Sequence, residues 1–172
     1  MTRQTFIIHT FTMAADFDED RIRLNTVDPA GQYQALVLTR RLADRFVPVL
    51  SERAEKAVAG PIPSDLVLDI EQEKLRMERD SNPQPPVESA PDALPWLCKT
   101  IHMADHPDGG VQLTFTDDTS VDAYLILDEQ SLRATLDVFL ITYRTLEWSE
   151  LAFPEWVRSR GSAQPVERGT LN

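Results

Sequence analysis

Apolar and polar residues alternate along several short stretches of this chain, and the same succession of stretches occurs twice. Residues 6–57 and residues 96–148 each fit three short strands followed by one amphipathic helix. In residues 21–26 the alternation is strict, so Ile22 and Leu24 are expected to share the inward face of a strand. The pattern predicts an α+β protein of two similar β-β-β-α units, with antiparallel sheets packed by helices and a pseudo-twofold arrangement.

The apolar positions of the two units can be matched residue by residue. An offset of 90 residues relates the first strands and the helices, and an offset of 88 relates the third strands. The matched pairs are Ile7 with Leu97, Phe11 with Ile101, Met13 with Met103, Leu36 with Tyr124, Leu38 with Ile126, Leu42 with Leu132, Phe46 with Leu136, Val49 with Phe139 and Leu50 with Leu140. Neither unit could bury its apolar faces well alone. We therefore expect either sheets joined edge to edge or two helices covering one shared sheet.

Helix signals are clearest in the second unit. Asp128 is a good N-cap residue for the apolar stripe that follows it, and Thr39 can cap the helix of the first unit. Pro48 lies inside that first helix and is expected to kink it or to break it. Between the units, residues 64–79 favour a helix by propensity, although residues 66–70 also fit a strand.

Four segments follow from this pattern. Residues 1–60 form the first unit, 61–95 a helix and a proline-rich linker, 96–157 the second unit with an aromatic extension, and 158–172 a disordered tail. The linker proper, residues 80–95, contains five prolines and little apolar content. Such a composition predicts a semi-extended and mobile connection.

Charge and cysteine content limit the classes of function. Asp and Glu outnumber Lys and Arg by 28 to 17, for a net charge of −11, which disfavours binding to nucleic acid. No apolar run approaches the roughly 20 residues that span a bilayer, so no membrane association is expected. Cys98 is the single cysteine and cannot form an internal disulfide. With no secretory signal pattern, the expected compartment is the reducing cytoplasm.

Two features are candidate contacts for a protein partner. The first is the aromatic extension after the second helix, because Trp and Phe are typical interface anchors. The alternative is that these rings fold back over the core. The second is a basic patch at the start of the first helix, which either contacts an acidic partner or pairs with Asp44 and a nearby acidic loop. The candidate residues are Trp148, Phe153 and Trp156 in the extension and Arg40 and Arg41 in the patch.

Cys98, His102, Asp105 and His106 form the only cluster of metal-ligand types in the sequence. Four residues apart on one strand, Cys98 and His102 would share a face. Structural zinc requires four ligands, however, so the favoured interpretation is a buried cysteine and two surface histidines, with no metal or cofactor.

The chain contains neither a nucleophile elbow nor a phosphate-binding glycine loop. We therefore expect a small acidic, non-catalytic interaction protein, such as an adaptor, an assembly factor or an inhibitor. It would bind a protein partner through a sheet edge or through the aromatic extension, and leftover strand edges could support a homodimer. The competing hypothesis is an enzyme or small-ligand-binding protein with a pocket between the units, assisted by a metal at Cys98, His102 and His106.

Overall fold

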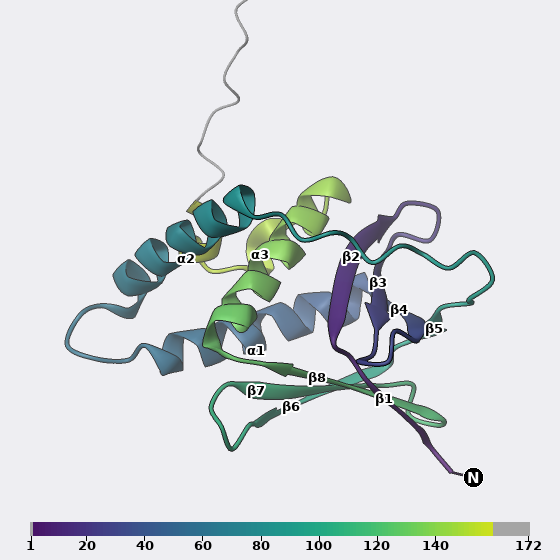
Figure 1. Ribbon diagram of the computed structural model, residues 1–172. Helices are drawn as coiled ribbons and strands as arrows, with labels where there is room; N and C mark the ends of the chain where they lie inside the picture. The colour runs from purple at the N-terminus through teal and green to yellow at the C-terminus, as the bar shows by residue number, and fades with distance from the viewer. Residues whose placement is uncertain (1, 160–172) are drawn as a thin grey trace, which may run out of the picture.

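The computed structural model describes residues 2–159, which form two four-stranded sheets and a set of helices (Figure 1). The strands are β1 (Gln4–Ile7), β2 (Thr10–Asp16), β3 (Arg21–Val27), β4 (Tyr33–Thr39), β5 (Trp96–Leu97), β6 (Thr100–Asp105), β7 (Val111–Thr116) and β8 (Val121–Leu127). The helices are α1 (Arg40–Ala57), α2 (Ser64–Ser81), α3 (Glu129–Thr145), the short 3-10 helix η1 (Glu150–Ala152) and α4 (Glu155–Arg158). The first sheet has the order β2-β3-β4-β5, and the second has the order β1-β8-β7-β6.

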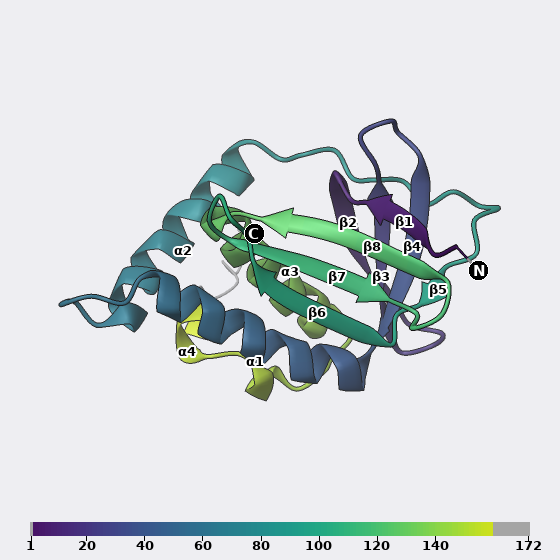
Figure 2. The same ribbon diagram turned by 90° about the horizontal axis from the view of Figure 1, so that it is seen from below.

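This architecture confirms the predicted α+β class with two similar units. Strands β2, β3 and β4 and helix α1 form the first unit, and β6, β7, β8 and α3 form the second. Figure 1 shows α1 and α3 above the second sheet, with the first sheet standing upright at one end of them. In Figure 2 the outer face of the second sheet is in front, and no helix of the described chain covers it.

The leading segment of each unit is shared between both sheets. The sequence pattern predicts one strand over residues 5–13 and another over residues 96–103, and both predictions are wrong in the same way. β1 pairs in parallel with β8 of the second unit, whereas β2 belongs to the first sheet. Correspondingly, β5 pairs in parallel with β4, whereas β6 belongs to the second sheet. The two units therefore exchange their first strands, instead of joining edge to edge or sharing one sheet.

The chain crosses from one sheet to the other at Ile8 and at Cys98, which are both buried. The same backbone hydrogen bond follows each crossing. It joins His9 N–H to Val27 O at 2.8 Å and Lys99 N–H to Thr116 O at 2.9 Å. Both sheets bury their side chains in one continuous core, so the alternation of apolar residues does not change where the chain passes from one sheet to the other. The sequence pattern therefore does not reveal the crossing.

The strand register shows which residues of the two units are equivalent. An offset of 90 holds for the first strands, since Met13 faces Leu24 and Met103 faces Leu113. The offset of 88 predicted for the third strands is wrong. Leu36 and Leu38 are equivalent to Leu125 and Leu127, at an offset of 89, because Leu24 and Ile22 face the first pair and Leu113 and Val111 face the second. The hairpin of the second unit is one residue shorter, which changes the offset from there on.

Both predicted helix caps are present, and they extend the offset of 89 into the helices. The Thr39 side chain accepts a hydrogen bond from Leu42 N–H at 3.2 Å, and the Asp128 carboxylate accepts one from Ser131 N–H at 2.7 Å. The predicted helical offset of 90 is therefore one residue too large. α1 continues through Pro48, so this proline does not break the helix.

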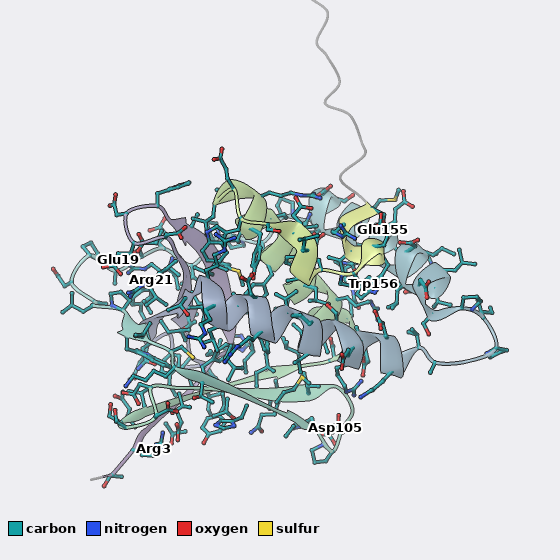
Figure 3. All side chains as sticks on the ribbon, turned by 180° about the vertical axis from the view of Figure 1, so that it is seen from behind. Arg3, Glu19, Arg21, Asp105, Glu155 and Trp156 are labelled. Atoms are coloured by element: carbon teal, nitrogen blue, oxygen red, sulfur yellow. The ribbon has the colours of Figure 1, made fainter. Side chains whose placement is uncertain are left out.

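Helices α1 and α3 pack together so that the start of each lies near the end of the other. At one end, the Tyr143 hydroxyl donates to Asp44 Oδ1 at 2.8 Å. At the other end, Arg53 of α1 bonds Asp105 at 2.9 Å and Glu129 at 3.1 Å (Figure 3 labels Asp105). Each helix end is thus tied to the opposite unit, as the pseudo-twofold arrangement requires.

Helix α2 is confirmed over the segment predicted to favour helix, and a buried ion pair holds it to α3. Arg76 Nε donates to Asp137 Oδ1 at 2.8 Å, and the same guanidinium donates to Val157 O at 2.8 Å. Arg79 also bonds the Asp137 carboxylate. None of the helices in the described part of the chain is long and apolar enough to cross a membrane.

Candidate functional site

One of the larger hollows in the described part of the chain lies between the two units. It is a groove of about 510 Å³, bounded by β2 of the first unit and by β8 and α3 of the second. The start of the linker forms one rim. We call it the β2 groove, and its lining residues are His9, Thr10, Phe11, Thr12, Met13, Gln84, Pro85, Leu125, Ile126, Leu127, Ser131, Ala134, Thr135 and Val138.

β2 presents an unpaired strand edge to this groove. Asp28 N–H donates to Gln32 O at 3.0 Å, so the backbone groups of Asp28 point toward β4. Because the direction alternates along a strand, every second residue of β3 before Asp28 also points toward β4, and the residues between them point toward β2. On β2, the backbone N–H and C=O groups of Phe11 and Met13 consequently point away from β3. No strand of the described chain pairs with β2 on this side. The groove therefore offers hydrogen-bonding positions for an added strand.

A second stretch of strand is also unpaired at the groove. β1 ends at Ile7, which lies opposite Tyr124, so β1 pairs with only the first part of β8. Within residues 2–159, no strand continues the pairing beside Leu125, Ile126 and Leu127. The exchange of first strands thus creates the groove, because the chain leaves β8 at Ile8 in order to begin β2.

The groove is uncharged. None of its fourteen lining residues is Asp, Glu, Lys or Arg, although these types make up 26% of the chain. Phe11 and Met13 of β2 face Leu125 and Leu127 of β8 across the interior. A ligand here would gain mainly from apolar burial and from backbone hydrogen bonds, and would find no counter-ion.

An equivalent hollow exists in the other half of the molecule, and it is smaller. It has a volume of about 240 Å³. We call it the β6 groove, and it is lined by Leu42, Arg45, Phe46, Val49, Ile101 and Met103. Ile101 and Met103 are the counterparts of Phe11 and Met13 at the offset of 90, and the four α1 residues are the counterparts of four α3 residues at the offset of 89.

The helix residues that line the two grooves differ in size, and the β2 groove also extends over Leu125, Ile126 and Leu127. Ser131 stands in α3 where α1 has Leu42, Ala134 stands where α1 has Arg45, and Thr135 stands where α1 has Phe46. Val138 and Val49 are identical. Smaller side chains stand at three of the four equivalent positions of the larger groove. Beside the β6 groove, a further hollow of about 570 Å³ continues along β6 and α1 from Met103.

The proline-rich linker crosses the outer face of the first sheet after it leaves the groove. Val87 N–H donates to Thr12 Oγ1 at 2.8 Å, and Arg23 donates to Ser89 Oγ at 3.1 Å. Figure 1 shows this segment running from α2 over β2 toward β5. The semi-extended form predicted for the linker is present, and the linker bonds to the sheet at these two points.

The structure places the predicted aromatic contacts inside the protein. Trp148, Phe153 and Trp156 are only 5%, 2% and 3% exposed. Trp148 Nε1 donates to Asp20 Oδ1 at 2.6 Å, and Trp156 Nε1 donates to Glu55 Oε1 at 3.1 Å (Figure 3 labels Trp156). Both Trp148 and Phe153 lie edge-on to the Tyr143 ring. The aromatic extension therefore folds back over the core, which was the alternative interpretation of the sequence.

The basic patch lies at the surface, since Arg40 and Arg41 are both exposed. The Arg40 guanidinium lies 5.7 Å from the centre of the Trp148 ring and 3.8 Å from Asp44. Partner binding by these arginines and by the aromatic extension stays a prediction. A partner at this surface would contact exposed residues such as Arg41 and Leu151, which is 86% exposed.

The residues of the hypothetical metal site do not converge. Cys98 is buried where the chain crosses between sheets, and its Sγ lies 3.3 Å from Thr100 O. His102 is exposed on β6. Burial raises the pKa of the Cys98 thiol to about 12. Among residues 2–159, no three His, Cys, Asp or Glu side chains come together to hold a metal ion.

The chain's predicted tail, residues 158–172, lies largely outside the described residues. Arg158 is among the described residues and is the last residue of helix α4.

Comparison with known proteins gives no relative from which a function could be transferred. No protein-family model, no curated protein and no solved structure matches this chain.

Proposed function

We propose that this protein is a non-catalytic interaction module that binds an extended segment of a protein partner in the β2 groove. The observation that supports the proposal is the size difference between two equivalent hollows. The hollow lined by the smaller residues of α3 has a volume of about 510 Å³, and the one lined by the larger residues of α1 about 240 Å³.

An extended segment suits this groove because its backbone can pair with β2. Addition of a strand to a sheet edge obtains affinity from main-chain hydrogen bonds and specificity from pockets for alternate side chains. The Phe11 and Met13 backbone groups offer the bonds, and the space beside Ala134 and Thr135 offers the pocket. Exposed edges of this kind are usually blocked in proteins that do not use them.

The absence of charge from the groove argues against ionic ligands. A phosphate, a carboxylate or a nucleic acid backbone would be desolvated there without a compensating cation. The net charge of −11 elsewhere on the chain adds long-range attraction toward a partner with basic residues outside the bound segment.

The proposal can be tested with a random library of linear peptides, about twelve residues long, displayed on phage and panned against the whole protein. Binding of the selected peptides is then measured by fluorescence anisotropy. Val138→Arg should weaken binding at least tenfold, because it places a long charged side chain in the β2 groove. Val49→Arg, at the equivalent position of the β6 groove, is the matched control and should change the Kd less than twofold.

Hydrogen exchange gives the location of binding directly. The amides of Phe11 and Met13 should become protected when a selected peptide is added, because their N–H groups gain partners. A library that yields no binders, or binders unaffected by Val138→Arg, would overturn the proposal. If the edge of β2 instead pairs with a second copy of the chain, sedimentation will show a dimer that Val138→Arg dissociates.

The second candidate is binding of a small apolar ligand in the same groove. The volume of about 510 Å³ lies within the range of roughly 300–1,000 Å³ that is typical of such sites. A neutral apolar fluorophore that binds with the same Val138→Arg sensitivity, in a protein for which no peptide can be selected, would favour this candidate.

A further inference from the structure

We infer that the edge of β6 is a second docking site, which takes an acidic extended segment of a protein partner between β6 and α1. The inference goes beyond the proposed function, because it concerns an edge of the other sheet and a different class of segment. It assigns Arg45 and Lys56 as the residues that recognise the carboxylates of this segment.

β6 has free backbone groups along its outer side. It is an edge strand of the second sheet, and no strand of the described chain pairs with it on the side away from β7. His106 N–H donates to Gly110 O at 3.1 Å, so the backbone groups of His106 point toward β7. Because the direction alternates along a strand, those of Ile101 and Met103 point away from β7. An added strand can bond to them.

The space beside this edge is long enough for several residues of a bound chain. The β6 groove and the adjoining hollow meet at Met103, and together they follow β6 from Ile101 to Asp105 and α1 from Leu42 to Ala57. Figure 2 shows α1 running beside β6. A strand that pairs with β6 would therefore direct alternate side chains toward α1.

The helix wall of this space is basic, whereas the β2 groove is uncharged. α1 carries five basic and three acidic residues, although the chain as a whole has a net charge of −11. Arg45 lines the β6 groove, and Lys56 lines the adjoining hollow. The equivalent positions of α3 are Ala134 and Thr145. An acidic segment therefore meets complementary charge beside β6 and none beside β2.

The two cations are also available to a partner. Both are exposed, and neither forms an ion pair with a carboxylate of residues 2–159. Arg53, which lies between them on α1, is already paired with Asp105 at 2.9 Å and with Glu129 at 3.1 Å. These are the two acidic residues that line the space, so its own carboxylates are taken up by Arg53 and leave Arg45 and Lys56 unpaired.

The separation of the two cations limits the sequence of the segment. The eleven residue steps of helix from Arg45 to Lys56 correspond to roughly 16 Å. An extended chain covers this distance in about five residues, and only alternate side chains face the helix. The segment should therefore carry two Asp or Glu residues about four or six positions apart. Val49 and Met103 line the middle of the space and favour apolar side chains between them.

A selection on the Val138→Arg protein tests the inference independently of the proposed function. The β2 groove is obstructed in this variant, so random linear peptides panned against it must bind elsewhere. Ala134→Arg serves the same purpose if circular dichroism shows that Val138→Arg is unfolded. The selected peptides should contain the acidic pair at the expected spacing.

Charge reversals then identify the residues that bind the peptides. Arg45→Glu and Lys56→Glu, each introduced into the protein used for selection, should weaken binding about fivefold by fluorescence anisotropy, because each replaces an attraction by a repulsion. The loss should shrink in about 1 M sodium chloride, which screens exposed charges. Lys74→Glu is the matched control. It makes the same change of charge on an exposed part of α2 that lines neither hollow, and should change the Kd less than twofold.

Hydrogen exchange locates the peptide. The amides of Ile101 and Met103 should become protected when a selected peptide is added, and those of Phe11 and Met13 should not. A library without binders, binders without the acidic pair, or an equal loss for Lys74→Glu would overturn the inference and leave the proposed function standing. Protection of Ile101 and Met103 that rises with protein concentration in the absence of peptide would show that a second copy pairs with β6, and would also overturn it.

Discussion

The grooves beside β2 and β6 are built from equivalent positions of two similar units, yet the first has a volume of about 510 Å³ and the second about 240 Å³. Both have an edge strand on one side and the helix of the opposite unit on the other. They differ in the helix residues that face the strand. Because the fold is repeated, each groove can be compared with its equivalent in the other half of the protein.

A second difference lies on the other side of the same two helices. Asp137 of α3 receives the buried arginine of α2, and its equivalent in α1 is Pro48, which borders a shallow hollow shared with η1 and the aromatic extension. The two helices therefore differ where they meet the additional elements. Equivalent substitutions in the two units should therefore differ in their effect on stability.

The largest expected effect is the loss of the buried ion pair. Asp137→Ala should lower the free energy of unfolding by about 3–5 kcal/mol, because Arg76 would keep a buried charge without this carboxylate. Chemical denaturation measures the change. Pro48→Ala, at the equivalent position, should leave stability unchanged or raise it, since Pro48 takes part in no ion pair. A loss below 1 kcal/mol for Asp137→Ala would contradict the assigned role.

The next effect concerns the aromatic extension, which only the second unit has. Trp148→Phe should cost about 2 kcal/mol, because it removes the hydrogen bond from Nε1 to the Asp20 carboxylate and part of the buried ring. Asp20→Asn is the matched control. It keeps an oxygen acceptor and tolerates the positive φ of 53° at this position, so its cost should stay below 1 kcal/mol.

The two helix caps differ in charge and should therefore differ in their response to pH. Backbone and side-chain hydrogen bonds from Ser131 lower the pKa of Asp128 below its ordinary value of 3.8. A lowered folded-state pKa means that the contribution of the cap is complete above pH 5 and is lost as the pH falls below 3.8 and through the folded value. Asp128→Ala should cost about 1 kcal/mol at pH 7, and this difference from the wild type should shrink as the pH falls below 3.8 and the carboxylate is protonated.

Thr39 provides the comparison, because its hydroxyl group does not titrate. Thr39→Ala should also cost about 1 kcal/mol, and the cost should be the same at pH 7 and at pH 3. Urea denaturation across the pH range measures both variants. A pH-independent cost for Asp128→Ala would show that the charge of the cap contributes nothing.

The smallest effect is expected where the two units are most alike. Cys98 and Ile8 hold equivalent buried positions at the two crossings, so Cys98→Val should change stability by less than about 1 kcal/mol. Because the thiol is buried and its pKa is raised to about 12, a thiol-reactive dye at pH 8 should label the wild type only as it unfolds. Rapid labelling of the native protein would show that this crossing opens.

The sequence pattern was sufficient for the units, the caps and the α+β class, since each depends on local alternation or on a single capping residue. The crossings at Ile8 and Cys98 could not be predicted, because both sheets bury side chains in the same core and the apolar pattern does not stop there. The one-residue difference between hairpins also escaped prediction. Because of it, the sequence comparison aligned Phe46 with Leu136. Both residues are large and buried, so the error was not apparent.

The sequence suggested a pocket between the units only as the competing hypothesis, and with this misalignment the residues that line the groove could not be identified. Ser131, Ala134 and Thr135 are ordinary helix residues when considered alone, and only comparison with Leu42, Arg45 and Phe46 shows that space is missing. The correct offset was available in principle from the two N-cap residues. The burial of Trp148 and Trp156, in contrast, depends on contacts with Asp20 and Glu55, which are far away in the sequence.

The exchange of first strands has a consequence for the order of events during synthesis. β1 leaves the ribosome first but pairs with β8, which is made only after the linker and most of the second unit. The β2-β3-β4 meander can form early from local contacts, whereas Gln4 must wait for Val121. A nascent chain arrested before β8 should therefore carry a free N-terminal strand that a protease can cut, and release of the finished chain should protect it.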